Sequence, residues 1–152
     1  MIELLKDLVA TFREGKGPVP EPALERLCAA LMLQLAAIDQ NLDAAEETVI
    51  QEYIRRHFGL TEEETRRTLE DARDDAERAT SLYELTSVIN SRCDEDQKVY
   101  LIYQMWCLAF ADGTLDRYEE HFIRRAAELL YVPHVRMMRA KHDAAQDTGF
   151  GH

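Results

Sequence analysis

The sequence contains little of what builds β-structure or marks a secreted or membrane-bound chain. Only six glycines and four prolines occur in 152 residues, and no Val-, Ile- or Thr-rich run alternates with polar residues over the length of a strand. No apolar stretch approaches the roughly 18–20 residues that span a membrane. The N-terminus lacks the basic start and the long apolar centre of a signal peptide. These absences favour an α-helical protein in the cytoplasm, without a membrane span.

Cysteines are few, and basic residues are outnumbered by acidic ones. Cys28, Cys93 and Cys107 form no C-x-x-C pair and lie in or beside apolar stretches, as expected for thiols in a reducing compartment. The 29 acidic residues against 18 basic ones give a net charge of −11. Such a charge repels nucleic acid and anionic membranes, so we expect neither as a partner. It suits cations or basic proteins, and it also keeps a protein soluble.

Apolar residues recur at helical spacing along most of the chain. The length fits one domain that buries its own core. We therefore predict an all-α, single-domain bundle of seven or eight helices, with the chain divided into an N-terminal helix and linker (1–20), a helical domain (21–145) and a frayed tail (146–152). Expected helices cover about 2–14, 21–39, 43–58, 61–79, 82–90, 94–112, 116–131 and 133–145.

The N-terminal segment has a clear amphipathic pattern. Leu4, Leu5, Leu8, Val9 and Phe12 fall on one stripe of the helix expected between Ile2 and Glu14. The Gly- and Pro-rich stretch that follows, residues 15–20, breaks this helix and reads as a linker.

Two segments of the sequence coincide when the chain is shifted by 73 residues. Residues 32–50 and 105–123 are identical at nine of nineteen positions, where composition alone gives roughly one or two. We infer that the bundle contains a duplicated helical hairpin with pseudo-two-fold symmetry, in repeat halves of about 24–58 and 97–131.

The repeated signature is Asp-x-x-Leu-Asp-x-x-Glu-Glu, and it gathers carboxylates around each hairpin turn. Because gathered carboxylates repel one another unless they are neutralised, a hard divalent cation such as Ca²⁺, Mg²⁺ or Mn²⁺ is one explanation. The spacing is not that of an EF-hand. The candidate metal ligands are Asp112, Asp116 and Glu119 in the second copy, with Asp39, Asp43 and Glu46 as counterparts in the first.

Helix capping is the alternative explanation for the same residues. Asp-x-x-Glu before an apolar run is a capping box, and acidic residues favour helix N-termini. Capping accounts for Asp43 with Glu46 and for Asp116 with Glu119. It does not account for the first Asp of each copy, which lies at a helix C-terminus, where the dipole disfavours a carboxylate. Both explanations remain open from the residues.

The acidic signature, best formed in residues 111–119, resembles that of the TerB-like family, named for tellurite-resistance proteins. The resemblance extends over roughly residues 24–138. It implies an all-helical bundle with a metal site at the acidic loops, in a module that works in sensing, scaffolding or stress response. The first copy has Gln40-Asn41 where the second has Gly113-Thr114, which predicts a weaker first site.

Three functions are compatible with these patterns. The first is a non-catalytic, cation-binding helical module that acts through protein partners in stress response or metal homeostasis. The second is a metal-dependent hydrolase or phosphatase that uses the clustered carboxylates; no paired histidine stands near the acidic loops to support it. The third is a metal-free interaction scaffold.

Residues 70–78 contain both acidic and basic side chains, which predicts a solvated helix face, with Asp75 placed to meet Arg78.

Overall fold

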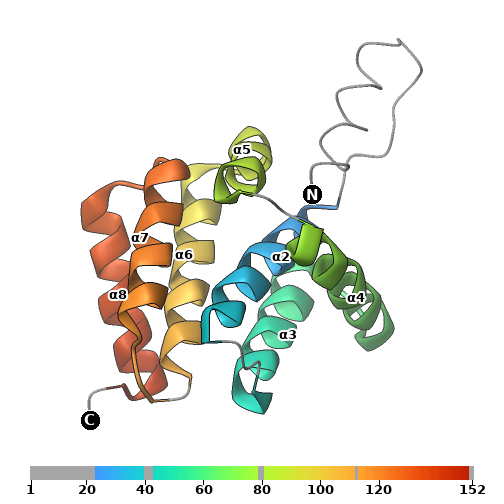
Figure 1. The fold of residues 1–152 in the computed structure, drawn as a ribbon, viewed down its shortest axis with the longest axis horizontal. Helices are drawn as coiled ribbons and strands as arrows, with labels where there is room; N and C mark the ends of the chain where they lie inside the picture. Colours follow the sequence, from blue (N-terminus) through green and yellow to red (C-terminus); the bar gives the residue numbers. More distant parts are fainter. Residues whose placement is uncertain (1–22, 40–42, 79–80, 112, 151–152) are drawn as a thin grey trace.

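The computed structural model describes residues 23–39, 43–78, 81–111 and 113–150 (Figure 1). The helix expected at 2–14 lies outside these residues. Seven α-helices, one 3₁₀ turn and no strand occur in the part of the chain described, which confirms the all-α prediction. The elements are α2 (Leu24–Ala36), η1 (Ala37–Asp39), α3 (Ala44–Phe58), α4 (Glu62–Arg78), α5 (Leu82–Arg92), α6 (Glu95–Phe110), α7 (Arg117–Leu129) and α8 (His134–Thr148).

Helices α2 and α6 form the centre of the bundle. Both bury residues on nearly all sides, because α2 packs against α3, α4, α5 and α6, while α6 packs against α2, α3, α7 and α8. In Figure 1, α2 runs between α6 and the pair formed by α3 and α4, and α7 and α8 cover the other side of α6. Trp106 is fully buried on α6, as expected of a core residue. Helices α3, α4, α7 and α8 each bury one face and expose a charged one, whereas α5 exposes Tyr83 and Ser91.

The bounds of the helices follow the same 73-residue shift as the sequence. Shifting α2, α3 and α4 by 73 places them over α6, α7 and α8 to within a few residues. In each half the first and third helices pack closely. Helix α5 lies between the halves in the sequence, and the residues 73 positions before it, 9–19, lie outside the described ranges. A duplication of the hairpin with pseudo-two-fold symmetry stays an inference from the sequence.

Side-chain caps begin several helices where the sequence places them. Asp94 opens α6 with a complete capping box, in which its carboxylate accepts from the Gln97 backbone N–H at 2.8 Å. Thr61 and Glu64 form a capping box before α4, with hydrogen bonds of 3.0 and 3.1 Å between the side chain of each and the backbone N–H of the other. Ser81 caps α5 by accepting from the backbone N–H of Glu84. These local signals fix the start of each helix independently of the tertiary fold.

The C-terminal end differs from the expected frayed tail at residues 146–150. Helix α8 continues to Thr148, and Gly149 then adopts the left-handed conformation that ends many helices (φ +75°). The Phe150 N–H donates to the Ala145 carbonyl at 2.9 Å, and its ring stacks on Phe110 with centroids 4.2 Å apart. The tail is therefore ordered by an aromatic contact with α6, which the small and polar residues around Phe150 do not reveal.

Asp75 of α4 lies on the buried face of this helix, where the sequence predicts a solvated face. Asp75 does not meet Arg78 on a solvated face; it is 3% exposed and accepts two hydrogen bonds from the Arg26 guanidinium of α2, one of them at 2.7 Å. This pair raises the pKa of Arg26, mainly through the hydrogen bond. The i,i+3 spacing within α4 suggested a local partner, and a contact between residues 49 positions apart replaces it.

Candidate functional site

The two acidic hairpin turns lie where α2 leads into α3 and where α6 leads into α7, at the lower end of the bundle in Figure 1. Within each turn, the second Asp of the signature is the N-cap of the following helix. The Asp43 carboxylate accepts from the backbone N–H of Glu46 at 2.8 Å, and the Asp116 carboxylate accepts from that of Tyr118 at 2.6 Å. The capping role expected for both residues is therefore present.

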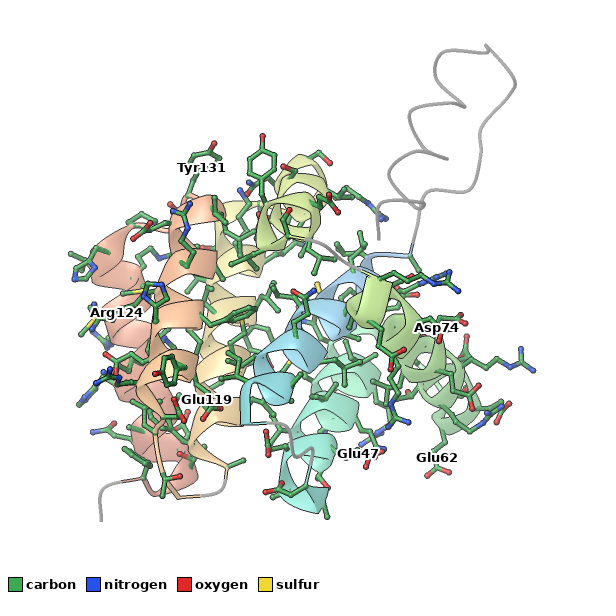
Figure 2. The ribbon with its side chains drawn as sticks, viewed as in Figure 1. Glu47, Glu62, Asp74, Glu119, Arg124 and Tyr131 are labelled. Carbon is green, nitrogen blue, oxygen red and sulfur yellow. The ribbon has the colours of Figure 1, made fainter. Side chains whose placement is uncertain are left out.

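The first Glu of each Glu-Glu pair is buried. Glu46 is 2% exposed in the first turn of α3, and Glu119 is 3% exposed at the matching position of α7. Figure 2 shows Glu119 on the side of α7 that faces the middle of the bundle. A carboxylate that loses water must be compensated by hydrogen bonds, by a helix N-terminus or by a cation. The structure thus gives both copies the same uncommon feature: a carboxylate at the helix start, turned away from solvent.

The second Glu of each pair is instead matched with a base from the third helix of its own half. Glu47 accepts from Arg73 of α4 at 3.1 Å. Glu120 accepts from Arg124 at 3.0 Å and from Lys141 of α8 at 3.5 Å. Burial acts to raise the pKa of Glu120, but these basic groups outweigh it and lower the pKa. Both outer carboxylates are therefore neutralised by protein cations, whereas the inner ones are buried.

The first Asp of each signature stands at the end of the first helix of its half. Asp39 ends η1, and its side chain and Asp112 lie outside the part of the chain that the structure describes. Next to Asp112, Gly113 has φ +85°, a conformation that L side chains rarely adopt. This glycine lets the second turn fold back, with its N–H donating to the Phe110 carbonyl at 3.0 Å. The matching Gln40 and Asn41 also lie outside the described residues.

Within the described ranges, no group of three or more His, Cys, Asp or Glu side chains is arranged to hold a metal ion. Asp43 caps α3 through the backbone N–H of Glu46, and Asp116 caps α7 through that of Tyr118. Each turn thus presents a capping Asp and a buried Glu. A ligand set of three carboxylates at either turn depends on Asp39 or Asp112.

Among the residues that the structure describes, no histidine joins two acidic side chains in a group that could hold a metal ion. His57 stacks between Tyr53 and Tyr100, at centroid distances of 5.4 and 5.0 Å, and burial lowers its pKa. His121 is exposed on α7, and His142 is exposed on α8.

None of the helices in the described part of the chain combines the length and hydrophobicity needed to cross a lipid bilayer.

Comparisons with known proteins agree on the fold. Residues 25–142 match the sequence model of a family described as tellurite resistance protein TerB. The crystal structure of a protein of unknown function from Porphyromonas gingivalis W83 superposes with a TM-score of 0.58 at 19% identity, covering 82% of this chain and 97% of that one. At that identity the likeness shows the fold alone. A search of curated proteins gave no match.

Proposed function

Because the chain belongs to the tellurite resistance protein TerB family, we propose that it is a non-catalytic helical module that binds a divalent cation at its acidic turns. It would act through protein partners in stress response or metal homeostasis. The family resemblance drawn from the acidic signature is confirmed by the match over residues 25–142. The cation, the partners and the physiological role are the proposed part.

The observation that carries the cation proposal is the burial of Glu46 and Glu119 at matching positions. Capping alone does not require a buried carboxylate, because a capping Glu can reach back to the N-cap backbone from the surface, as Glu64 does in α4. A cation held by this Glu together with the capping Asp and the first Asp of the signature would have three carboxylate ligands. Ca²⁺, Mg²⁺ and Mn²⁺ all prefer such oxygen ligands.

The test is thermal unfolding of the chelator-treated protein, alone and with Ca²⁺, Mg²⁺, Mn²⁺ or Zn²⁺ added singly. A ligand that binds only the native state stabilises it by about 2.7 kcal/mol at a hundred times its Kd. For a chain of this size that corresponds to a rise in Tm of roughly 5–10 °C. We expect one of the oxygen-preferring ions to give a rise that depends on its concentration.

Substitutions separate metal binding from capping. Asp116→Asn keeps a good N-cap and removes the charge, while Glu119→Gln keeps the volume of the side chain. Both should reduce or abolish the metal-dependent rise in Tm, and Asp112→Ala should do the same. Asp94→Asn is the matched control, because Asp94 caps α6 within a complete capping box away from the candidate site. A rise that survives Asp116→Asn and Glu119→Gln, or the absence of a rise with every ion, would rule out this site.

A metal-free interaction scaffold is the second candidate, and the capping bonds of Asp43 and Asp116 favour it. It predicts that Asp43→Asn and Asp116→Asn behave like the Asp94→Asn control in the presence and absence of every ion.

A further inference from the structure

The first half of the molecule has an open apolar groove, which we call the α2–α4 groove. Its volume is about 540 Å³, and its walls come from the end of α2, the second half of α4 and one ring of α7. Ala37 is exposed within it, while Ala76 and Phe122 are half-buried against the core. The groove is lined by the apolar residues Leu33, Ala36, Ala37, Ala76 and Phe122 and by the polar residues Gln34, Arg73 and Glu77.

The second half of the molecule fills the matching place with aromatic rings. Shifting Leu33, Ala37 and Glu77 by 73 residues gives Trp106, Phe110 and Phe150. These three side chains stack in series: Trp106 on Phe110 at 5.9 Å and Phe110 on Phe150 at 4.2 Å. The groove therefore lies where two aromatic rings of the other half are replaced by an alanine and a glutamate.

The N-terminal segment of the chain has an apolar stripe that would pack against an apolar surface. Residues 2–14 have Leu4, Leu5, Leu8, Val9 and Phe12 on one side of the predicted helix. A helix this short and amphipathic is marginal in water unless its apolar side is packed. Phe12 is the one aromatic residue of the stripe, and the missing rings of the first half are aromatic.

The linker is long enough for this contact within one molecule. Residues 15–22 separate the stripe from Ala23, the N-cap of α2. Fully extended, they span at most about 26–29 Å. From Ala23 to Ala37, the distance along α2 is about 21 Å. The end of the stripe at Phe12 can therefore reach the groove without changing the fold of residues 23–150.

We propose that the N-terminal segment 2–14 docks its apolar stripe into the α2–α4 groove, with Phe12 taking the place that Phe150 holds in the second half. The docked segment covers Leu33, Ala37 and Phe122. This contact is independent of the acidic turns and of any cation there.

The test is the accessibility of the groove in the full-length chain. Ala37→Cys, in a Cys93→Ser background that removes the half-exposed native thiol, places a probe at an exposed position of the groove. A maleimide should label this probe about tenfold more slowly in the chain with an intact stripe than in the same chain carrying Leu8→Asp and Phe12→Asp. Tenfold protection corresponds to a docked population of roughly 90%.

The matched control is Lys6→Asp, which introduces the same residue on the polar side of the predicted helix and should leave the protection intact. A second readout uses trypsin cleavage after Arg13. Ala37→Phe gives the groove the ring that Phe110 supplies in the second half, and it should expose Arg13 to cleavage about tenfold faster.

Three outcomes would overturn the proposal. Equal labelling rates with and without the stripe would show that segment 2–14 does not cover the groove. Protection that rises with protein concentration and survives Leu8→Asp with Phe12→Asp would assign the groove to a second copy of the chain. Unchanged cleavage after Arg13 in a folded Ala37→Phe variant would separate the segment from the groove. Far-UV circular dichroism and the Tm of each variant report whether residues 23–150 remain folded.

Discussion

The ion pair between Arg26 and Asp75 joins the start of α2 to the end of α4, and replacing Asp75 with Ala should destabilise the protein strongly. The carboxylate is 3% exposed and accepts two hydrogen bonds from the guanidinium. Removing one partner of a fully buried pair costs about 3–5 kcal/mol, because the other charge stays desolvated. The Arg26 side chain is 31% exposed, so water can partly solvate it in the variant. We therefore expect a loss of about 2–3 kcal/mol.

Urea unfolding at neutral pH, followed by far-UV circular dichroism, measures this loss directly. In thermal unfolding it corresponds to a fall in Tm of roughly 5–10 °C. Asp74→Ala is the matched control, since Asp74 is the exposed neighbour on the same helix (Figure 2) and its removal should change stability by less than about 0.5 kcal/mol. The double variant Arg26→Met with Asp75→Leu should recover most of the loss, because it removes both charges and keeps apolar volume. Equal effects of Asp75→Ala and Asp74→Ala would refute the reasoning.

Three further predictions concern backbone strain, pH and thiol reactivity. Tyr131 has φ +58°, and its side chain is 78% exposed. Tyr131→Gly should therefore leave the urea midpoint unchanged or raise the free energy of unfolding by up to about 1 kcal/mol. A clear loss of stability would mean that the tyrosine ring contributes packing. Burial lowers the pKa of His57, so the unfolded state binds the proton more tightly, and the free energy of unfolding should fall as the pH drops below about 6.5. The difference between the urea midpoints at pH 7.5 and 5.5 should be smaller in His57→Gln than in the unmodified protein. Burial raises the pKa of Cys28 to about 12 and of Cys107 to about 11. A thiol reagent at pH 8 should therefore modify the half-exposed Cys93 first and the other two cysteines only after unfolding. Equal rates of modification at all three cysteines would contradict the packing.

The sequence predicts those parts of the fold that depend on neighbouring residues. Asp94, Thr61 and Ser81 begin helices because a cap needs only a side chain and a backbone N–H two or three positions away. The apolar periodicity likewise predicts the buried face of each helix. Contacts between distant segments are not encoded in this way: the partner of Asp75 lies 49 positions away, and the ring that orders Phe150 lies on α6.

In the candidate site as well, the sequence predicts the local contacts and not the contacts between distant segments. Sequence spacing predicts that Asp43 and Asp116 stand at helix starts, and both do. It groups the two glutamates of each pair as equivalent acids, whereas the structure buries the first and matches the second with a base from another helix. The basic partners Arg73 and Lys141 come from helices that no local pattern connects to the turns. The different surroundings of the two glutamates are therefore a property of the tertiary packing.

Each half of the bundle adds a contact of a different kind to the packing of its third helix, and solvent conditions should affect the two halves to different degrees. In the first half, the partly exposed pair of Arg26 and Asp75 fastens α4 to α2, and added salt weakens such a pair. In the second half, Phe150 closes α8 onto Phe110, and apolar contacts strengthen in kosmotropic salts and weaken on cooling. Rising sulfate concentration should therefore tighten α8 more than α4, and cooling should favour the opening of α8. A molecule built from two similar sequences thus has halves whose local opening responds differently to the medium.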